Sequence, residues 1–232
     1  MFRRTRRLAL ISAIAASAIV LTACAGAAEP ETTEPVGEPD PDATLQVGLV
    51  LEPTNLDIRH TSGAALEQIL IDNIYEGLIS RTQENEIVPR LASDYEVSED
   101  GLTYTFTLNE GITFHSGTAL TSADVVSSYE AVRTDATLQG NAEFASVASI
   151  TAPDPTTVQI VLTAPNQNFL FSLTGPAGLV FQTGDTTDLK TAENGTGPFT
   201  LTRWNKGSAI TFARNEACLL YTSDAADEED SV

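Results

Sequence analysis

Few side chains in this sequence combine a reactive type with a spacing that supports chemistry. The 232 residues include two cysteines, Cys24 and Cys218, and two histidines, His60 and His115. A metal site needs several such ligands close together, and these histidines lie in separate segments with no second histidine at ligand spacing. We therefore expect no metal site and structural roles for both histidines. Two cysteines are also too few for a disulfide framework.

The sequence lacks the motifs by which hydrolases and nucleotide-binding enzymes are usually recognised. It has no Gly-x-Ser-x-Gly elbow, no His-Glu-x-x-His pair and no phosphate loop. Acidic residues number 32 against 12 basic ones, they are scattered along the chain, and the formal net charge is −20. Such a charge repels phosphate backbones, so we expect no nucleic-acid partner. We predict no catalytic residues and no cofactor; a surface hydrolase and a purely structural surface protein remain alternatives.

Cys24 is the one residue whose surroundings specify a covalent modification. Four arginines precede an apolar run from Leu8 to Leu21, which has the length of a secretory signal and is too short to span a bilayer comfortably. The run ends in Leu21-Thr22-Ala23-Cys24, which looks like a bacterial lipobox, where the cysteine is lipidated and becomes the N-terminus. We predict a lipoprotein signal peptide over residues 1–23. An ordinary secretory signal with an incidental cysteine is the alternative.

Residues 24–43 are predicted to be a linker between the lipid and a folded body. Four prolines alternate there with six acidic side chains, so nothing in the segment can pack a core. Proline stiffens such a chain and like charges extend it. We expect a protein held at the outer face of the cytoplasmic membrane, in the periplasm or at the cell surface, through its lipid anchor alone.

The first half of the folded body shows a strand, a helix and a hairpin. Alternating apolar residues predict a strand over Leu45–Leu51, and Ser62 can cap a helix whose apolar positions continue to Leu78. Asp100-Gly101 is a strong turn signal. The return strand after it carries one apolar face, made of Tyr104, Phe106 and Leu108.

The second half mixes strands and helices in the same way. Thr121 and Asp124 resemble a capping box that opens a helix. Strands are predicted over residues 147–151 and 158–162, a short apolar helix or loop over 169–173, and a hairpin over 200–214 that contains Trp204. Elements of both kinds without regular βαβ alternation indicate an α/β or mixed α+β fold.

The order of these motifs resembles the extracytoplasmic solute-binding protein family 5, the peptide-, nickel- and oligopeptide-binding components of ABC importers. The resemblance covers residues 44–217 and is densest from Asp100 to Val125. It departs from the family at Cys218, where the family has an aromatic pair. The other segments that carry it are Pro53–Asp57, Ile74–Ile79, Ile87–Ala92, Gly195–Phe199 and Arg214-Asn215.

The resemblance implies a bilobal fold like that of type II periplasmic binding proteins, present here as part of lobe one and a small inserted subdomain. The inserted subdomain is expected over about residues 75–189, and the return to lobe one over residues 195–217. Residues 218–232 are interpreted as an acidic tail foreign to the family; a genuine short paralogue is the alternative. We expect the strand at Leu45 and the final hairpin to lack their partners and to expose apolar faces.

The resemblance also implies a function: capture of extracellular di- or oligopeptides by a monomer that delivers them to membrane permease subunits of an ABC transporter. A nickel chelate, haem, glutathione or a sugar is the alternative ligand. Trp204 is expected to pack in its hairpin, with stacking on ligand as the alternative. The resemblance points to ligand contact by His60, Thr61, Ser62, Gly63 and Ala64, and to a hinge or lobe crossing at Gly195, Thr196, Gly197 and Pro198.

Overall fold

The structure, a computed structural model, describes residues 43–218, which belong to two units divided between Gln46 and Val47. Residues 43–46 contain no helix or strand. All elements described below lie in the second unit. Cys24, the predicted signal peptide, the linker up to residue 42 and the tail from residue 219 lie outside the described residues.

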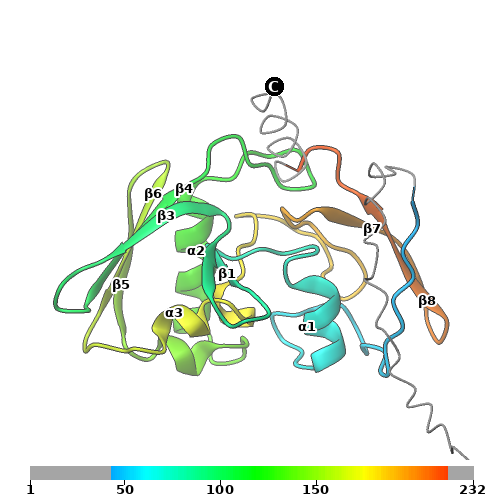
Figure 1. Cartoon of the computed structure of the whole chain (residues 1–232), viewed down its shortest axis with the longest axis horizontal. Helices are drawn as coiled ribbons and strands as arrows, with labels where there is room; N and C mark the ends of the chain where they lie inside the picture. Colours follow the sequence, from blue (N-terminus) through cyan, green and yellow to red (C-terminus); the bar gives the residue numbers. More distant parts are fainter. Residues whose placement is uncertain (1–42, 219–232) are drawn as a thin grey trace, which may run out of the picture. The chain divides into compact units, whose positions relative to one another are not determined.

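A four-stranded antiparallel sheet forms one end of the second unit (Figure 1). Its strands are β3 (Ala92–Val97), β4 (Thr103–Leu108), β5 (Val147–Asp154) and β6 (Thr157–Leu162), in the order β3-β4-β6-β5. The predicted hairpin is confirmed, with Gly101 at φ 69° in the turn, a conformation that favours glycine. Every second residue of β4 and β6 is buried, as the sequence alternation predicts.

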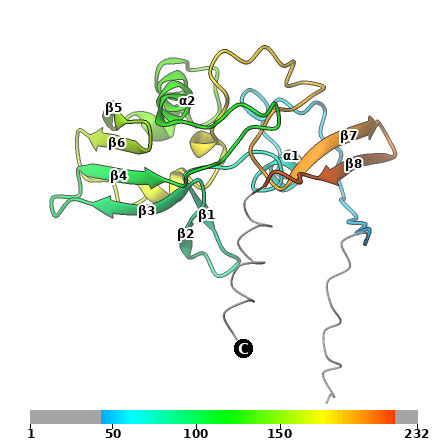
Figure 2. The same cartoon turned by 90° about the horizontal axis from the view of Figure 1, so that it is seen from above.

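Helix α2 (Ser122–Thr134) packs against this sheet, on strands β5 and β6 (Figure 2). It starts as predicted, because Asp124 accepts hydrogen bonds from the backbone N–H and the hydroxyl of Thr121, both at 2.9 Å. Val125, Tyr129 and Val132 recur at helical spacing and are buried toward the sheet.

The first core lies between α2 and the sheet and is built around aromatic rings. Phe144 and Phe169 are fully buried, and the rings of Tyr129 and Phe144 meet edge to face with centroids 5.4 Å apart. Short elements close this core. They are α3 (Phe169–Ser172), where the sequence left a helix or a loop open, and the 3₁₀ turns η1 (Asn141–Phe144) and η2 (Pro176–Gly178).

The second core packs α1 (Ala64–Leu70) against the hairpin of β7 (Phe199–Asn205) and β8 (Ala209–Arg214). The hairpin is confirmed, and Trp204 is half-buried in it, with its indole N–H donating to Glu52 at 2.9 Å. Most apolar hairpin side chains are half-buried against this core, so the expectation of an exposed apolar face is wrong there except at Phe199, which is 38% exposed.

Two further predictions about local structure are wrong. Residues 45–51 form no strand and expose their apolar side chains, because no described strand pairs with them through backbone hydrogen bonds. The first helix ends at Leu70, and the chain then turns at Asp72 with φ 61°. Ile74 and Leu78 are buried as their apolar character suggests, but in the turn and extended chain that follow the helix.

A small hairpin that the sequence did not indicate follows this turn. Strand β1 (Ile79–Arg81) pairs with β2 (Ile87–Pro89) in antiparallel register. No helix among residues 43–218 is long and apolar enough to cross a membrane.

Candidate functional site

A surface depression of about 650 Å³ lies between α1, the segment around Gly140, and the residues from Phe171 to Ala177. Helix α1 contributes Ala64, Glu67 and Gln68, because its apolar side chains turn the other way into the second core. The opposite side comes from α3, η1 and η2, which close the first core. The depression therefore lies where the two cores meet, and both cores position its walls.

Acidic side chains predominate among the charged residues of this depression. Glu67, Asp72 and Glu143 line it, together with a single cation, Arg81. The Arg81 guanidinium lies 4.5 Å from the ring centroid of Phe171, which is 48% exposed. Within residues 43–218, neither Glu67 nor Glu143 takes part in a salt bridge. These two carboxylates and Arg81 can therefore meet the charged groups of a solute.

The predicted ligand-contact segment, His60 to Ala64, runs beside this depression and reaches it at Ala64. A smaller hollow of about 120 Å³ is lined by Thr61, Ser62, Gly63 and Ala64. His60 lines neither hollow; its Nδ1 lies 2.9 Å from an oxygen of Asp57. The structure thus brings four of the five predicted residues to a concave surface and assigns His60 to a local turn.

Backbone groups in this segment are available to a ligand. Ser62 and Gly63 are exposed, and among the described residues no protein acceptor takes a hydrogen bond from their N–H groups. The turn before them is well fixed, because Thr61 donates to the Asn55 side chain at 3.1 Å and Asp57 accepts from the backbone N–H of Arg59 at 3.2 Å. Such fixed, unsatisfied N–H groups are what an extended peptide pairs with when it adds a strand.

The predicted crossing, Gly195 to Pro198, is buried against the turn that follows α1. The Gly197 N–H donates to the Ile74 carbonyl at 2.9 Å. A Cβ on Gly195 would lie 1.8 Å from the same carbonyl oxygen, so only glycine fits this close approach. Whether the segment bends during ligand binding stays a prediction.

An ion pair with a buried carboxylate anchors this crossing, and no motif of the sequence predicted it. The Glu76 carboxylate lies 2.7 Å from Nε of Arg90 and accepts a hydrogen bond from the Thr196 hydroxyl at 2.8 Å. Burial raises the pKa of Glu76, against the opposing effects of the Arg90 charge and the Thr196 hydroxyl. A charged residue inside the apolar run from Ile74 to Leu78 is the sequence signal that could have found it.

His115 also contacts the predicted crossing. Its ring lies between Glu193 and the carbonyl of Gly197, and its backbone N–H donates to the Gly195 carbonyl at 2.8 Å. In the part of the chain that the structure describes, no group of three or more His, Cys, Asp or Glu residues could hold a metal ion.

Comparison with known proteins gives a family match over most of the folded body. Residues 86–226 match the family model of bacterial extracellular solute-binding proteins, family 5 Middle. The glutathione-binding protein GsiB of Pectobacterium atrosepticum is 31% identical over 170 residues, which cover 71% of this chain and 32% of that protein. GsiB of Escherichia coli strain K12 is 32% identical over 158 residues, which cover 66% of this chain and 31% of that protein. The chain therefore spans about a third of the length of these curated relatives.

Solved structures agree on the fold. The periplasmic binding protein AgaA from A. tumefaciens R10, in complex with agropinic acid, superposes with a TM-score of 0.64 at 31% identity, over 72% of this chain and 35% of that one. DppA from Helicobacter pylori, in complex with the peptide STSA, superposes with a TM-score of 0.63 at 25% identity, over 71% of this chain and 37% of that one. The expected type II periplasmic-binding-protein fold class is confirmed by these neighbours.

Proposed function

This chain belongs to the bacterial extracellular solute-binding proteins of family 5, and we propose that it captures small peptides outside the cytoplasm for an ABC importer. The observation that carries the proposal is the family match over residues 86–226. Members of this family are binding proteins and not enzymes, which agrees with the absence of catalytic motifs from the sequence. The chain is proposed to act as a monomer that delivers its solute to the permease subunits.

The concave surface beside α1 supports a peptide as the ligand. The free N–H groups of Ser62 and Gly63 suit main-chain pairing, which gives affinity with little dependence on ligand sequence. Glu67 and Glu143 suit a ligand ammonium group, and Arg81 suits a carboxylate. Ligand contact by residues 61–64 and closure about residues 195–198 are parts of the same proposal, since closure would follow from a ligand that touches both lobes.

Glutathione is a specific candidate within the peptide class. Relatives at 31% and 32% identity are named as glutathione-binding proteins, and glutathione is itself a tripeptide with one ammonium and two carboxylate groups. A nickel chelate remains a second candidate ligand, because NikZ of Campylobacter jejuni, solved with Ni(L-His), shares the fold with a TM-score of 0.61.

A thermal-shift panel on the purified chain tests the ligand class. Dipeptides, tripeptides, glutathione, nickel–histidine, haem and a disaccharide are compared at equal concentration. A ligand present at a hundred times its Kd stabilises the folded state by about 2.7 kcal/mol, so the correct class raises the melting temperature and the others do not. Stabilisation by the disaccharide alone would contradict the peptide proposal.

Membrane attachment through Cys24 is proposed from the sequence alone. Acyl chains contribute about 0.8 kcal/mol per buried methylene, so a multiply acylated cysteine holds a protein firmly at a bilayer. Mass spectrometry of the exported protein is expected to find lipid on Cys24 and no residues before it. A Cys24→Ser variant should leave the membrane fraction, and an unmodified Cys24 thiol in the exported protein would refute the anchor.

A further inference from the structure

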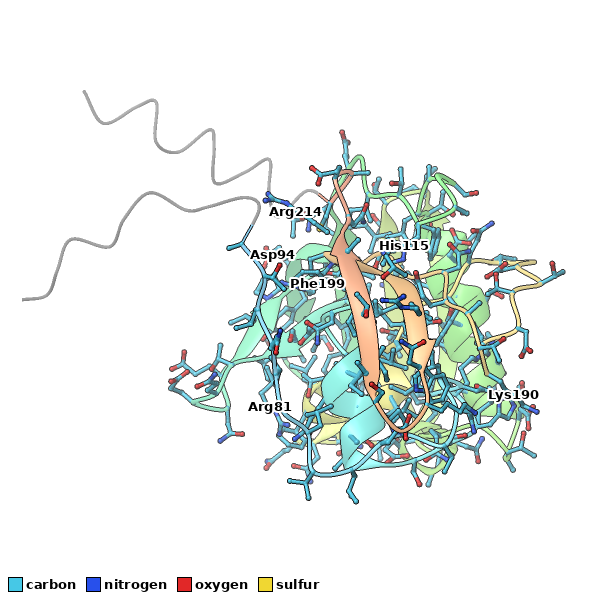
Figure 3. The ribbon with its side chains drawn as sticks, turned by 90° about the vertical axis from the view of Figure 1, so that its right-hand side faces the viewer. Arg81, Asp94, His115, Lys190, Phe199 and Arg214 are labelled. Atoms are coloured by element: carbon cyan, nitrogen blue, oxygen red, sulfur yellow. The ribbon has the colours of Figure 1, made fainter. Side chains whose placement is uncertain are left out.

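His115 is held between two hydrogen-bond acceptors in the interior of the second unit. Its Nδ1 lies 2.5 Å from an oxygen of Glu193, and its Nε2 lies 3.0 Å from the carbonyl oxygen of Gly197. The side chains of His115 and Glu193 are 6% and 7% exposed. His115 thus lies close to the start of β7 at Phe199 (Figure 3).

The protonation state of the ring decides how many of these contacts are hydrogen bonds. A neutral imidazole carries one N–H and can donate to only one of the two acceptors, whereas the imidazolium donates to both. With a neutral ring, a lone pair would face either the carboxylate or the carbonyl oxygen inside the protein. The geometry therefore favours the charged ring.

Glu193 extends this contact into the backbone of the crossing. One carboxylate oxygen accepts from the N–H of Gly195 at 3.2 Å, and the other accepts from the N–H of Leu201 at 3.1 Å. The His115 N–H donates in return to the Gly195 carbonyl at 2.8 Å. The imidazolium and the carboxylate together connect the loop at His115 to residues 193–197 and to β7, which lie about 80 residues later in the chain.

The surrounding charges are mostly negative. Glu76, buried nearby, is paired with Arg90, and Asp185 accepts from the side chain of Asn194 at 3.0 Å. Burial is the largest single influence on the pKa of His115, and it lowers that pKa because it disfavours the charged ring. The hydrogen bonds to Glu193 and Gly197, with the charges of Glu193 and Glu76, outweigh burial and raise the pKa of His115.

We propose that doubly protonated His115 is a pH-sensitive latch, which holds residues 193–197 against the loop at His115 and loosens them when the ring loses its proton. Folding raises the pKa of this histidine, so its stabilisation is complete below the unfolded value of about 6.5 and is lost as the pH rises through the folded value. Residues 193–197 overlap the proposed lobe crossing, so under the proposed function the latch would also govern how freely that crossing moves.

Two NMR measurements on the full wild-type chain test the latch without any variant. Ring ¹⁵N shifts report the protonation of His115, and amide exchange reports the protection of Gly195 and Leu201. We expect both ring nitrogens to be protonated at mildly acidic pH and the ring to titrate above the unfolded value of about 6.5. As the ring titrates, protection of the two amides should fall by about tenfold or more beyond the ordinary base-catalysed rise, because a charge-assisted hydrogen bond is lost. The amide of Phe106 in β4 is the internal control and should show only the base-catalysed rise.

A pair of matched variants separates the latch from a general effect of histidine titration. His115→Gln keeps at most one donor toward the two acceptors, so the pH-dependent step in protection should disappear. His60→Gln removes an exposed histidine that also contacts a carboxylate, that of Asp57, and the step should remain. A His115 ring that titrates below the unfolded value of about 6.5 would overturn the proposal, and so would protection that stays unchanged while the ring titrates. Both outcomes can be read from the wild-type chain even if His115→Gln does not fold.

Discussion

Substitution of Gly195 by alanine should destabilise the second unit by about 3 kcal/mol. An ideal Cβ at this position lies 1.8 Å from the Ile74 carbonyl oxygen and 2.6 Å from its carbon, whereas real Cβ contacts are almost never shorter than 3.0 Å. The obstruction is backbone, so no side-chain rotation can relieve it. The crossing must therefore move away from the turn after α1.

The magnitude follows from the hydrogen bonds that this movement breaks. They are the bond from Gly197 N–H to the Ile74 carbonyl at 2.9 Å, that from His115 N–H to the Gly195 carbonyl at 2.8 Å, and that from the Thr196 hydroxyl to a buried carboxylate at 2.8 Å. Each is worth about 1 kcal/mol net, which gives about 3 kcal/mol, at the upper end of the range for overpacked sites.

Urea unfolding monitored by tryptophan fluorescence measures the effect, because Trp204 is the only tryptophan and lies in the second core. Gly63→Ala is the matched control, since a Cβ there would meet no atom within 4 Å. The control should change the free energy of unfolding by less than about 0.5 kcal/mol. If Gly195→Ala unfolded at the same urea concentration as the control, the close approach of these two segments would be refuted.

Three further substitutions test the first core. Asp124→Ala removes the Oδ2 atom that accepts both bonds from Thr121, together with the Oδ1 atom that accepts from the N–H of Thr183, and should cost about 2 kcal/mol in urea unfolding; a loss as small as that of a typical surface substitution would contradict the described cap. Tyr129→Phe leaves the Gly178 carbonyl without the hydroxyl that donates to it at 3.0 Å and should lower the free energy of unfolding by about 1–2 kcal/mol. A melting temperature equal to that of the wild type would contradict this hydrogen bond. Phe144→Ala creates a cavity in the aromatic cluster and should cost about 3–5 kcal/mol, measured by calorimetry; a value below about 1 kcal/mol would mean that Phe144 is not in the core.

The sequence predicts the elements of the first core well, because their patterns are local. Alternation in β4 and β6, the turn at Gly101 and the capping box at Thr121 each depend on residues close together in the chain. Where hydrogen-bond partners come from elsewhere, prediction fails. Apolar alternation over residues 45–51 does not form a strand when no described strand pairs with it, and helical periodicity does not reveal the turn at Asp72.

The candidate site is predictable only on its α1 side. Residues 61–64 were indicated by the resemblance, whereas Glu143 and Phe171 reach the depression through packing between the two cores. The pairs formed by Glu76 with Arg90 and by His115 with Glu193 join residues 14 and 78 positions apart, a separation that no local pattern reports. Glu76, a charged residue inside the apolar run from Ile74 to Leu78, was the available hint for the first pair.

An NMR titration of the chain with a tripeptide most directly tests the proposal that this concave surface binds solute. At millimolar concentrations, which detect even weak binding of about −4 kcal/mol, we expect amide shifts at residues 61–64 and along the depression at Glu67 and Gln139. Amide shifts absent from these residues, or confined to the far strands of the four-stranded sheet, would contradict it.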